Sequence, residues 1–257
     1  MDQHDLAARQ FGDKASNYLT SQVHATGADL ERVHGLAGHL RPAAALDLGC
    51  GGGHIAFALA RAGVGHVVAY DFAQPMLEVV AQEAARRGHT AIRTRQGAAE
   101  QLPFEDGAFG LVVSRFSAHH WLSVPRALTQ AARVLAPGGT LVIIDVTAPE
   151  SALLDTTLQT LEVLRDMSHV RDYRCSEWQS MLHAAGFGQA AIDSWKLRME
   201  FDGWVKRIGT SPRRVDAIRA MQADLPSEAR SYFELAADGS FSIDASWLQC
   251  RHASAAT

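Results

Sequence analysis

Short apolar runs alternate with helical patterns of apolar residues between residues 43 and 146. The apolar runs predict strands over residues 44–48, 66–70, 91–96, 109–114 and 140–146. Apolar positions at helical spacing predict intervening helices over residues 54–62, 74–87 and 124–136. Pro75 opens the second of these helices and Gly88 closes it. This alternation is typical of βαβ units and predicts an α/β fold with a Rossmann-like, doubly wound sheet.

After residue 146 the pattern changes, and helices outnumber strands. It predicts helices over residues 151–166, 176–185, 203–208, 212–223 and 227–236, and strands over 190–199 and 241–248. We expect seven mostly parallel strands with an antiparallel last strand, plus helical lid insertions. The expected parts of a single domain over residues 1–257 are an N-terminal helical cap (1–42), a cofactor-binding core (43–146) and substrate lids (147–175 and 203–236).

A glycine-rich turn from Asp47 to His54 joins the first predicted strand to the first core helix. Glycine lets the backbone approach a ligand because no Cβ intervenes, and the helix start directs unsatisfied N–H groups into the same space. A dinucleotide fingerprint counted from Gly49 would need glycine where the chain has His54. The acidic Asp47 disfavours a pyrophosphate and favours a ligand with an ammonium and a sulfonium. S-adenosylmethionine carries both.

Asp71 ends the second predicted strand, where an acidic residue binds ribose hydroxyls in Rossmann-type sites. The alternative is that Asp71 only caps the helix that begins near Gln74. Acidic residues at the ends of successive strands, Asp47 and Asp71, favour the ligand-binding interpretation.

The composition of the chain limits the kinds of binding partner that we expect. The chain has 257 residues, 47% of them hydrophobic, with a net charge of -4 and no long basic run. We therefore expect a small-molecule substrate, and neither nucleic acid nor a membrane surface as partner. Three scattered cysteines, no basic-then-apolar leader and no apolar run of roughly 20 residues favour a cytoplasmic protein.

Five motifs in order carry a family resemblance. They are Leu46–His54, Val68–Asp71, Pro75–Leu77, Gly97–Phe104 and Leu135–Leu141. The chain resembles class I S-adenosylmethionine-dependent methyltransferases of the type 11 group, which includes ubiquinone/menaquinone C-methyltransferases, and is most similar to bacterial YafE-type members of unassigned substrate. The resemblance implies S-adenosyl-L-methionine as cofactor and methyl transfer by in-line displacement to a small-molecule O, N or C acceptor.

The resemblance also implies a set of cofactor-binding residues. These are Asp47, Gly49, Cys50, Gly51, Gly53, Asp71, Phe72, Met76, Ala98, Ala99, Ser114, Arg115 and Phe116. Phe72 and Met76 would lie against the adenine face, with core packing as the alternative. Ala98 stands where members commonly carry an aspartate that binds the adenine amino group, so backbone groups of Ala98 and Ala99 would replace it. Glu100 is expected to face a helix cap or solvent.

His119 is the candidate base or substrate orienter, because imidazole titrates near neutral pH, although a structural role is the alternative. A zinc site from His119, His120 and His169 is disfavoured because no ligand spacing supports it, so we expect no metal. Candidate substrate contacts lie in the segments that would cover the site. They are Tyr18, His24, His169, Tyr173, Arg174 and Trp204, each of which could instead pack within a lid.

Two other functions stay open from the sequence. A protein that binds S-adenosylmethionine without methylating anything is suggested by Ala98 and by the lack of an unmistakable base. An NAD-dependent oxidoreductase is suggested by the glycine turn and Asp71, but His54 and Asp47 oppose it. The acceptor and the oligomeric state are left open.

Overall fold

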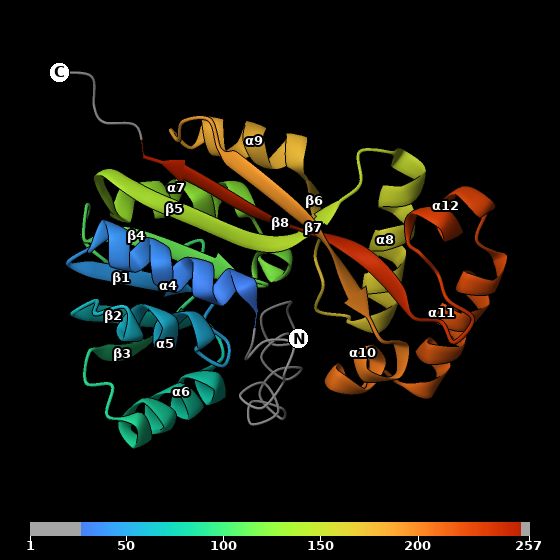
Figure 1. Cartoon of the computed structure of the whole chain (residues 1–257), viewed down its shortest axis with the longest axis horizontal. Coiled ribbons are helices and arrows are strands. Elements are labelled where there is room, and N and C mark those ends of the chain that lie inside the picture. The colour runs from blue at the N-terminus through green and yellow to red at the C-terminus, as the bar shows by residue number, and fades with distance from the viewer. Residues whose placement is uncertain (1–26, 253–257) are drawn as a thin grey trace.

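The computed structural model describes residues 27–252, which form a central sheet of eight strands in the order β3-β2-β1-β4-β5-β8-β7, with β6 beside β5 (Figure 1). The strands are β1 (Ala44–Leu48), β2 (His66–Asp71), β3 (Ile92–Gln96), β4 (Phe109–Arg115), β5 (Leu135–Ala148), β6 (Tyr173–Arg174), β7 (Ala191–Met199) and β8 (Phe241–Arg251). Strands β1 to β6 pair in parallel, and β8 runs antiparallel to both β5 and β7. The prediction of a mostly parallel Rossmann-like sheet with an antiparallel last strand is confirmed.

Helices cover both faces of the parallel part of the sheet. Helices α4 (Ala28–Leu40), α5 (His54–Arg61) and α6 (Gln74–Arg87) bury their apolar residues in one core cluster, and α7 (Val124–Val134) and α9 (Cys175–Ala184) bury theirs in another. Helix α7 illustrates why the sequence folds this way. Its buried residues Val124, Ala127, Leu128 and Ala131 recur every three or four positions, and the Ser123 side chain caps it by accepting from the Arg126 N–H.

A separate group of helices packs around the far ends of the long strands β5, β7 and β8 (Figure 1). It consists of α8 (Ala152–Arg165), α10 (Phe201–Ile208), α11 (Pro212–Asp224) and α12 (Ser227–Tyr232). Leu158, Trp204, Phe233 and Phe241 are each about 1–2% exposed and belong to the apolar core of this group. We call these four helices the distal helical group.

Most predicted elements match the structure to within a few residues, with two kinds of exception. The last predicted helix, 227–236, ends at Tyr232, and β5 begins at Leu135, inside the predicted helix 124–136. The pairing of β4 with β5 shifts register between Phe109 and Leu111, so the early part of β5 is an irregular extension that an apolar pattern does not reveal. Two short elements were not predicted, β6 and a 3-10 turn, η1 (Ala118–His120).

Of the predicted N-terminal cap, 1–42, the structure describes the part from residue 27 onward, which contains α4. Between residues 27 and 252, each helix is too short or too polar to cross a bilayer.

Candidate functional site

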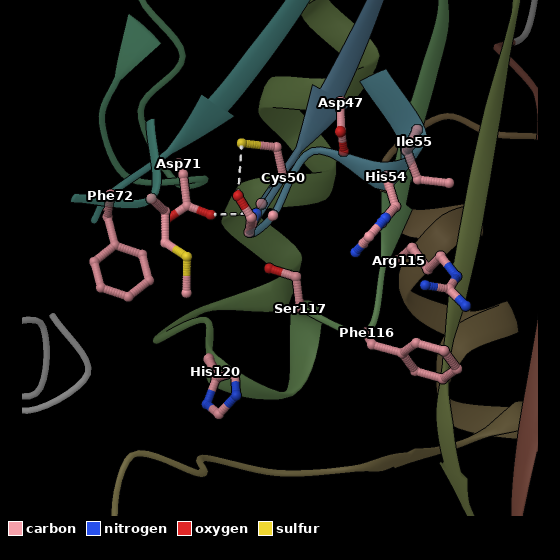
Figure 2. A pocket seen from close by; sticks show the side chains of 14 residues that line it. Asp47, Cys50, His54, Ile55, Asp71, Phe72, Arg115, Phe116, Ser117 and His120 are labelled. Carbon is pink, nitrogen blue, oxygen red and sulfur yellow. Dashed lines mark hydrogen bonds between the residues drawn. The ribbon is translucent and has the colours of Figure 1, made fainter. Parts of the chain in front are cut away.

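A cavity of about 650 Å³ lies at the carboxyl ends of β1, β2 and β4, where open α/β sheets bind ligands (Figure 2). Of the predicted cofactor-binding residues, its lining contains Asp47, Gly49, Cys50, Gly51, Asp71, Phe72, Met76, Arg115 and Phe116. Residues of the lining that were not predicted are Gly52, His54, Ile55, Ser117 and His120. The structure thus brings most of the predicted set together around one space.

Asp47 supports the start of helix α5 from the end of β1. Its Oδ2 accepts a hydrogen bond of 2.9 Å from the Ala56 N–H, one of the N–H groups that the first turn of a helix leaves unpaired. The side chain is 1% exposed, and this burial raises the pKa of Asp47 to about 8, with Asp71 adding to the effect. A cationic ligand group in the cavity would favour the ionised carboxylate.

The glycine loop needs its glycines for two different reasons. Gly49, Gly51 and Gly53 all have positive φ, at 74°, 47° and 78°. At Gly49 a Cβ would come within 1.9 Å of the Ser117 Oγ, so the loop and the turn after β4 can approach only without a side chain. At Gly53 a Cβ would meet Val80 on α6, and Gly53 lies outside the cavity lining. Gly53 therefore serves the packing of the loop.

Asp71 joins the glycine loop to the turn before α6. Its Oδ2 accepts from the Gly51 N–H and its Oδ1 from the Ala73 N–H, both at 2.9 Å. Ala73 is the N-cap residue of α6, so Asp71 organises the helix start and also lines the cavity. Burial raises the pKa of this carboxyl above its ordinary value. Because a carboxylate offers about four lone-pair positions, two backbone bonds leave it capacity for ligand hydroxyls.

The residues predicted to contact adenine lie at this cavity or directly beside it. Met76 is 2% exposed and forms a small apolar cluster with Ala73, against which Phe72 packs, so packing and cavity lining coexist at this position. Ala98 and Ala99 line a smaller neighbouring cavity that shares Asp71 and Phe72 with the first.

The Ala98 carbonyl already accepts from the Tyr70 hydroxyl at 3.2 Å and from the Gln101 N–H at 3.1 Å. This favours N–H groups for any contact with a purine edge. Glu100 Oε1 accepts from the N–H of Ser123, the N-cap of α7, as expected for a residue that faces a helix cap.

The end of β4 supplies the boundary of the cavity. Arg115 forms a buried ion pair with Asp29 of α4. Phe116 has a φ of 48°, which is uncommon outside glycine, and its N–H donates to the Ile144 carbonyl at 2.7 Å. Ser114, predicted to line the site, is instead fully buried within the sheet and lies outside the lining, because alternate residues of a strand point to opposite faces.

A second cavity of about 680 Å³ adjoins the first and shares Phe116 and His120 with it. We call it the acceptor-side cavity. It is lined by residues from η1, the sheet and the distal helical group, including Trp204, the one predicted substrate residue in this lining.

The other predicted substrate residues lie elsewhere. His169 is 7% exposed, with its Nε2 3.1 Å from the Gln159 side-chain oxygen, and it lies outside both linings. Tyr173 packs edge-on against Trp178, and Arg174 pairs with Glu177, so neither lines these two cavities. The positions of Tyr18 and His24 lie outside the described residues.

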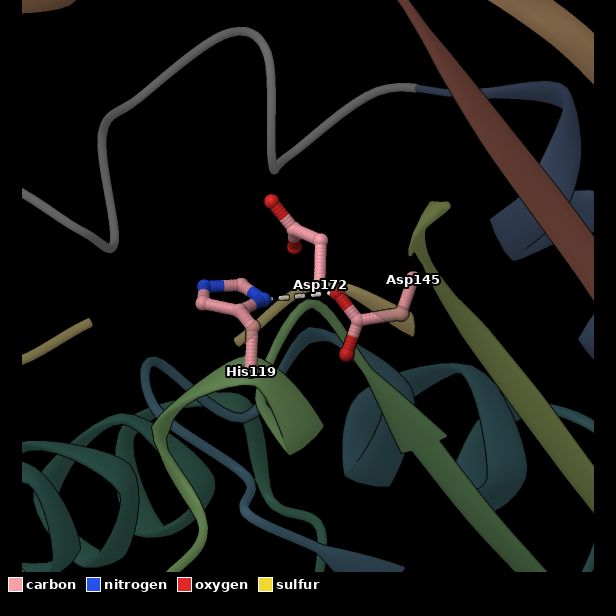
Figure 3. Close-up of side chains that lie close together, drawn as sticks. All are labelled: His119, Asp145 and Asp172. Carbon is pink, nitrogen blue, oxygen red and sulfur yellow. Dashed lines mark hydrogen bonds and ion pairs between the residues drawn. The ribbon is translucent and has the colours of Figure 1, made fainter. Parts of the chain in front are cut away.

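His119 and His120 occupy different environments although they are adjacent. The His119 Nδ1 lies 2.6 Å from Asp145 Oδ1 (Figure 3). Burial alone would lower the pKa of His119, but the Asp145 carboxylate raises it to about 9. His119 is therefore protonated at neutral pH, which suits an orienting cation and disfavours the predicted role as general base.

His120 lines both cavities and was not predicted as a site residue. Its Nδ1 lies 3.1 Å from the Ser168 carbonyl oxygen, which requires that Nδ1 carry the proton and donate it. Burial and the neighbouring His119 lower the pKa of His120 to about 4, so the ring is neutral at physiological pH. The adjacent pair was visible in the sequence, but only the η1 turn decides which histidine faces the first cavity.

Comparison with known proteins agrees with this geometry. Residues 46–143 match the family model described as a methyltransferase domain. The chain is 48% identical to the uncharacterized protein YafE of Escherichia coli (strain K12) over 181 residues, which cover 70% of this chain and 87% of YafE. It is 36% identical to the uncharacterized methyltransferase YcgJ of Bacillus subtilis (strain 168) over 223 residues, covering 87% of this chain and 88% of YcgJ.

Two of the solved structures that match share most of this architecture. The crystal structure of YcgJ superposes with a TM-score of 0.80 at 34% identity, covering 87% of this chain and 99% of that one. The BH2331 protein of Bacillus halodurans superposes with a TM-score of 0.82 at 31% identity, covering 89% of this chain and all of the other.

Proposed function

The chain belongs to the methyltransferase domain family, and from this premise we propose that it transfers a methyl group from S-adenosylmethionine to a small-molecule acceptor. One observation carries the proposal. Two buried carboxylates, Asp47 and Asp71, end neighbouring parallel strands on either side of a glycine loop that leaves room for a ligand. This arrangement suits a ligand with a cationic end and a ribose.

The residues of the first cavity fit this cofactor. Gly49, Gly51 and Gly52 line it without side chains, so a ligand can contact their backbone. Asp47 would hold the cationic amino-acid end, and Asp71 would accept hydrogen bonds from ribose hydroxyls. Phe72 would cover the adenine face. S-adenosylmethionine supplies a methyl group already activated by its positively charged sulfur.

The chain contributes positioning more than proton transfer. Phe116 and His120 line both cavities. An acceptor in the second cavity would therefore lie closest to a cofactor in the first cavity at these two side chains. Holding the acceptor atom in line with the bond that breaks is worth about 7–11 kcal/mol in well-oriented reactions. The distal helical group would exclude water from the acceptor.

We also propose that residues 1–257 act as one domain, with the helices within 147–175 and 203–236 serving as substrate lids. The three cysteines are free thiols, which supports action in the reducing cytoplasm.

Isothermal titration with S-adenosylhomocysteine, the product of the cofactor, tests the proposal. We expect the wild-type protein to bind it, and Asp71→Ala to weaken binding by about 1–3 kcal/mol, or roughly 5- to 150-fold, because ribose hydroxyls lose their acceptor. Glu78→Ala is the matched control, since Glu78 is an exposed acidic residue on α6 that bonds only to Gln74 in the described structure.

Absence of S-adenosylhomocysteine binding to the wild-type protein would refute the proposal. Equal affinities of the Asp71→Ala variant and the wild type would refute the ribose assignment. NADH in the same cell is expected to give no binding heat, which separates this function from the oxidoreductase alternative.

A further inference from the structure

The acceptor-side cavity contains one carboxylate that its surroundings do not satisfy. The Asp172 side chain is 1% exposed and lines this cavity, and its Oδ2 has no hydrogen-bond partner among the described residues. The other carboxylates nearby are engaged: Glu162 pairs with Arg165, and Asp166 Oδ1 accepts from the Ser168 N–H and hydroxyl. A buried carboxylate without a partner is costly, so this position calls for a ligand group.

Charged and titratable groups surround Asp172. Those that act on its carboxyl are His119 of η1, Asp145 of β5, and Glu162 and Arg165 of α8, and His169 lies 3.8 Å away. His120, Asp166 and Arg207 line the same cavity. His119 is directed at Asp145, and Arg165 donates to Glu162 and to the Trp204 carbonyl.

His169 does not neutralise Asp172 either. Its Nε2 lies 3.8 Å from Asp172 Oδ2, beyond hydrogen-bond distance, and bonds to Gln159 instead. Burial lowers the pKa of His169 to about 2, so the ring is neutral and offers no positive charge. Burial also raises the pKa of Asp172 well above its usual range, although the nearby His119 acts in the opposite direction.

A metal ion is the first occupant to consider. One ligand atom each from His119, Asp145 and Asp172 lies within 4.8 Å of the others (Figure 3). The His119 Nδ1, however, is used in its 2.6 Å hydrogen bond to Asp145, and Asp145 also accepts from the Ala118 and Val146 N–H groups. A metal would have to break this bonded pair, whereas an N–H donor could reach Asp172 and leave the pair intact.

We propose that the acceptor-side cavity recognises a primary or secondary amine, bound as its ammonium to the Asp172 carboxylate. Trp204, Leu197 and Ile243 line the same cavity and would contact the hydrocarbon part of the acceptor. This inference rests on the proposed function, because it makes the amine the methyl acceptor class. A cation beside Asp172 favours its ionised form, so ammonium binding releases protons. For methyl transfer, the ammonium would return one proton to the Asp172 carboxylate. The freed nitrogen lone pair would then form the N–C bond to the methyl carbon as the C–S bond breaks, and the sulfur would keep that electron pair.

Three probes of similar size and different charge test the proposal. Phenethylamine, 2-phenylethanol and 3-phenylpropanoate are titrated into the protein saturated with S-adenosylhomocysteine, in buffers of different ionisation enthalpy at pH 7. We expect the amine to bind about 10-fold or more tightly than the alcohol or the carboxylate, because its hydrogen bond is to a charged group. Amine binding should also release protons, so its binding enthalpy should change with the buffer, and this readout needs no activity measurement.

Asp172→Asn should remove the preference for the amine and the proton release. Asp166→Asn is the matched control in the same cavity lining, since an amide oxygen can still accept both bonds that Asp166 Oδ1 receives from Ser168. This control should keep the preference. If Asp172→Asn fails to fold, the probe preference and the proton release of the wild-type protein decide alone.

Binding of S-adenosylhomocysteine without any preference for the amine would overturn this inference and leave the proposed function standing. Failure of S-adenosylhomocysteine to bind would overturn both. A third outcome would also overturn the inference. If manganese ions stabilise the wild-type protein and displace the amine, and do neither in Asp172→Asn, the cluster of His119, Asp145 and Asp172 is a metal site.

Discussion

Replacing Asp47 by asparagine separates the contribution of this carboxyl to folding from its contribution to ligand binding. An asparagine side-chain oxygen can keep the 2.9 Å bond from the Ala56 N–H, so the start of α5 stays supported. What disappears is a buried acid whose pKa rises from its ordinary value of 3.8 to about 8 in the folded protein. We expect the variant to be more stable than the wild type without ligand, and to bind S-adenosylmethionine less tightly.

The magnitude follows from the raised pKa of Asp47. Below about pH 3.8 the carboxyl is protonated in both folded and unfolded chains, and its contribution to stability is complete. As the pH rises toward 8, the unfolded chain ionises while the folded protein holds the proton, and stability is lost at about 1.4 kcal/mol per pH unit. Between pH 5 and 8 the wild type should therefore lose up to about 4 kcal/mol that Asp47→Asn retains.

Urea unfolding of the ligand-free protein at pH 5 and pH 8 measures this difference. Asp106→Asn is the control, because the Asp106 side chain is 81% exposed and its ion pair with Arg133 is worth at most about 1 kcal/mol. In a parallel titration, Asp47→Asn should lower the affinity for S-adenosylmethionine about 10-fold or more. A stability difference from the wild type that is the same at both pH values would show that burial of the acid is not the cause.

Two further substitutions test the loop and the histidine. Gly49→Ala should lower stability by about 1–3 kcal/mol and weaken S-adenosylhomocysteine binding, because its Cβ would meet Ser117, whereas Gly63→Ala, also at positive φ but facing open space, should cost about 1 kcal/mol and leave affinity unchanged. If urea unfolding shows that both variants are folded and they lose the same affinity for S-adenosylhomocysteine, the role assigned to Gly49 is contradicted. The pKa of His119, raised to about 9 by Asp145, gives stability that is complete below about pH 6.5 and is lost as the pH rises through 9. His119→Gln should abolish this pH-dependent loss, which amounts to roughly 3 kcal/mol. If the free energy of unfolding changes with pH equally in both proteins, His119 is not its source.

The core helices and strands were predictable because local sequence signals mark where each one begins and ends. Strand β1 and helix α6 match their predicted bounds, 44–48 and 74–87, since glycine, proline and an apolar run mark each end. Strand β6 was not predicted because its two residues become a strand only by pairing with Thr147 and Ala148 of β5.

The candidate site was predictable on its cofactor side for a related reason. Asp47 and Asp71 end strands that are adjacent in both sequence and sheet, so a parallel order brings them together. The acceptor side depends on segments far apart along the chain, such as Asp172 after α8. One signal was available there: Asp145 interrupts the apolar run of β5, and an acidic residue in a buried strand must have a partner.

The distal helical group has a hydrophobic cluster of its own, centred on residues such as Leu158, Trp204 and Phe241, while the residues of the glycine loop and Asp71 belong to the other end of the sheet. A lineage could therefore replace α8 and α10 to α12 with other helices and change the cavity lining around Trp204, while the glycine loop and its two aspartates stay as they are.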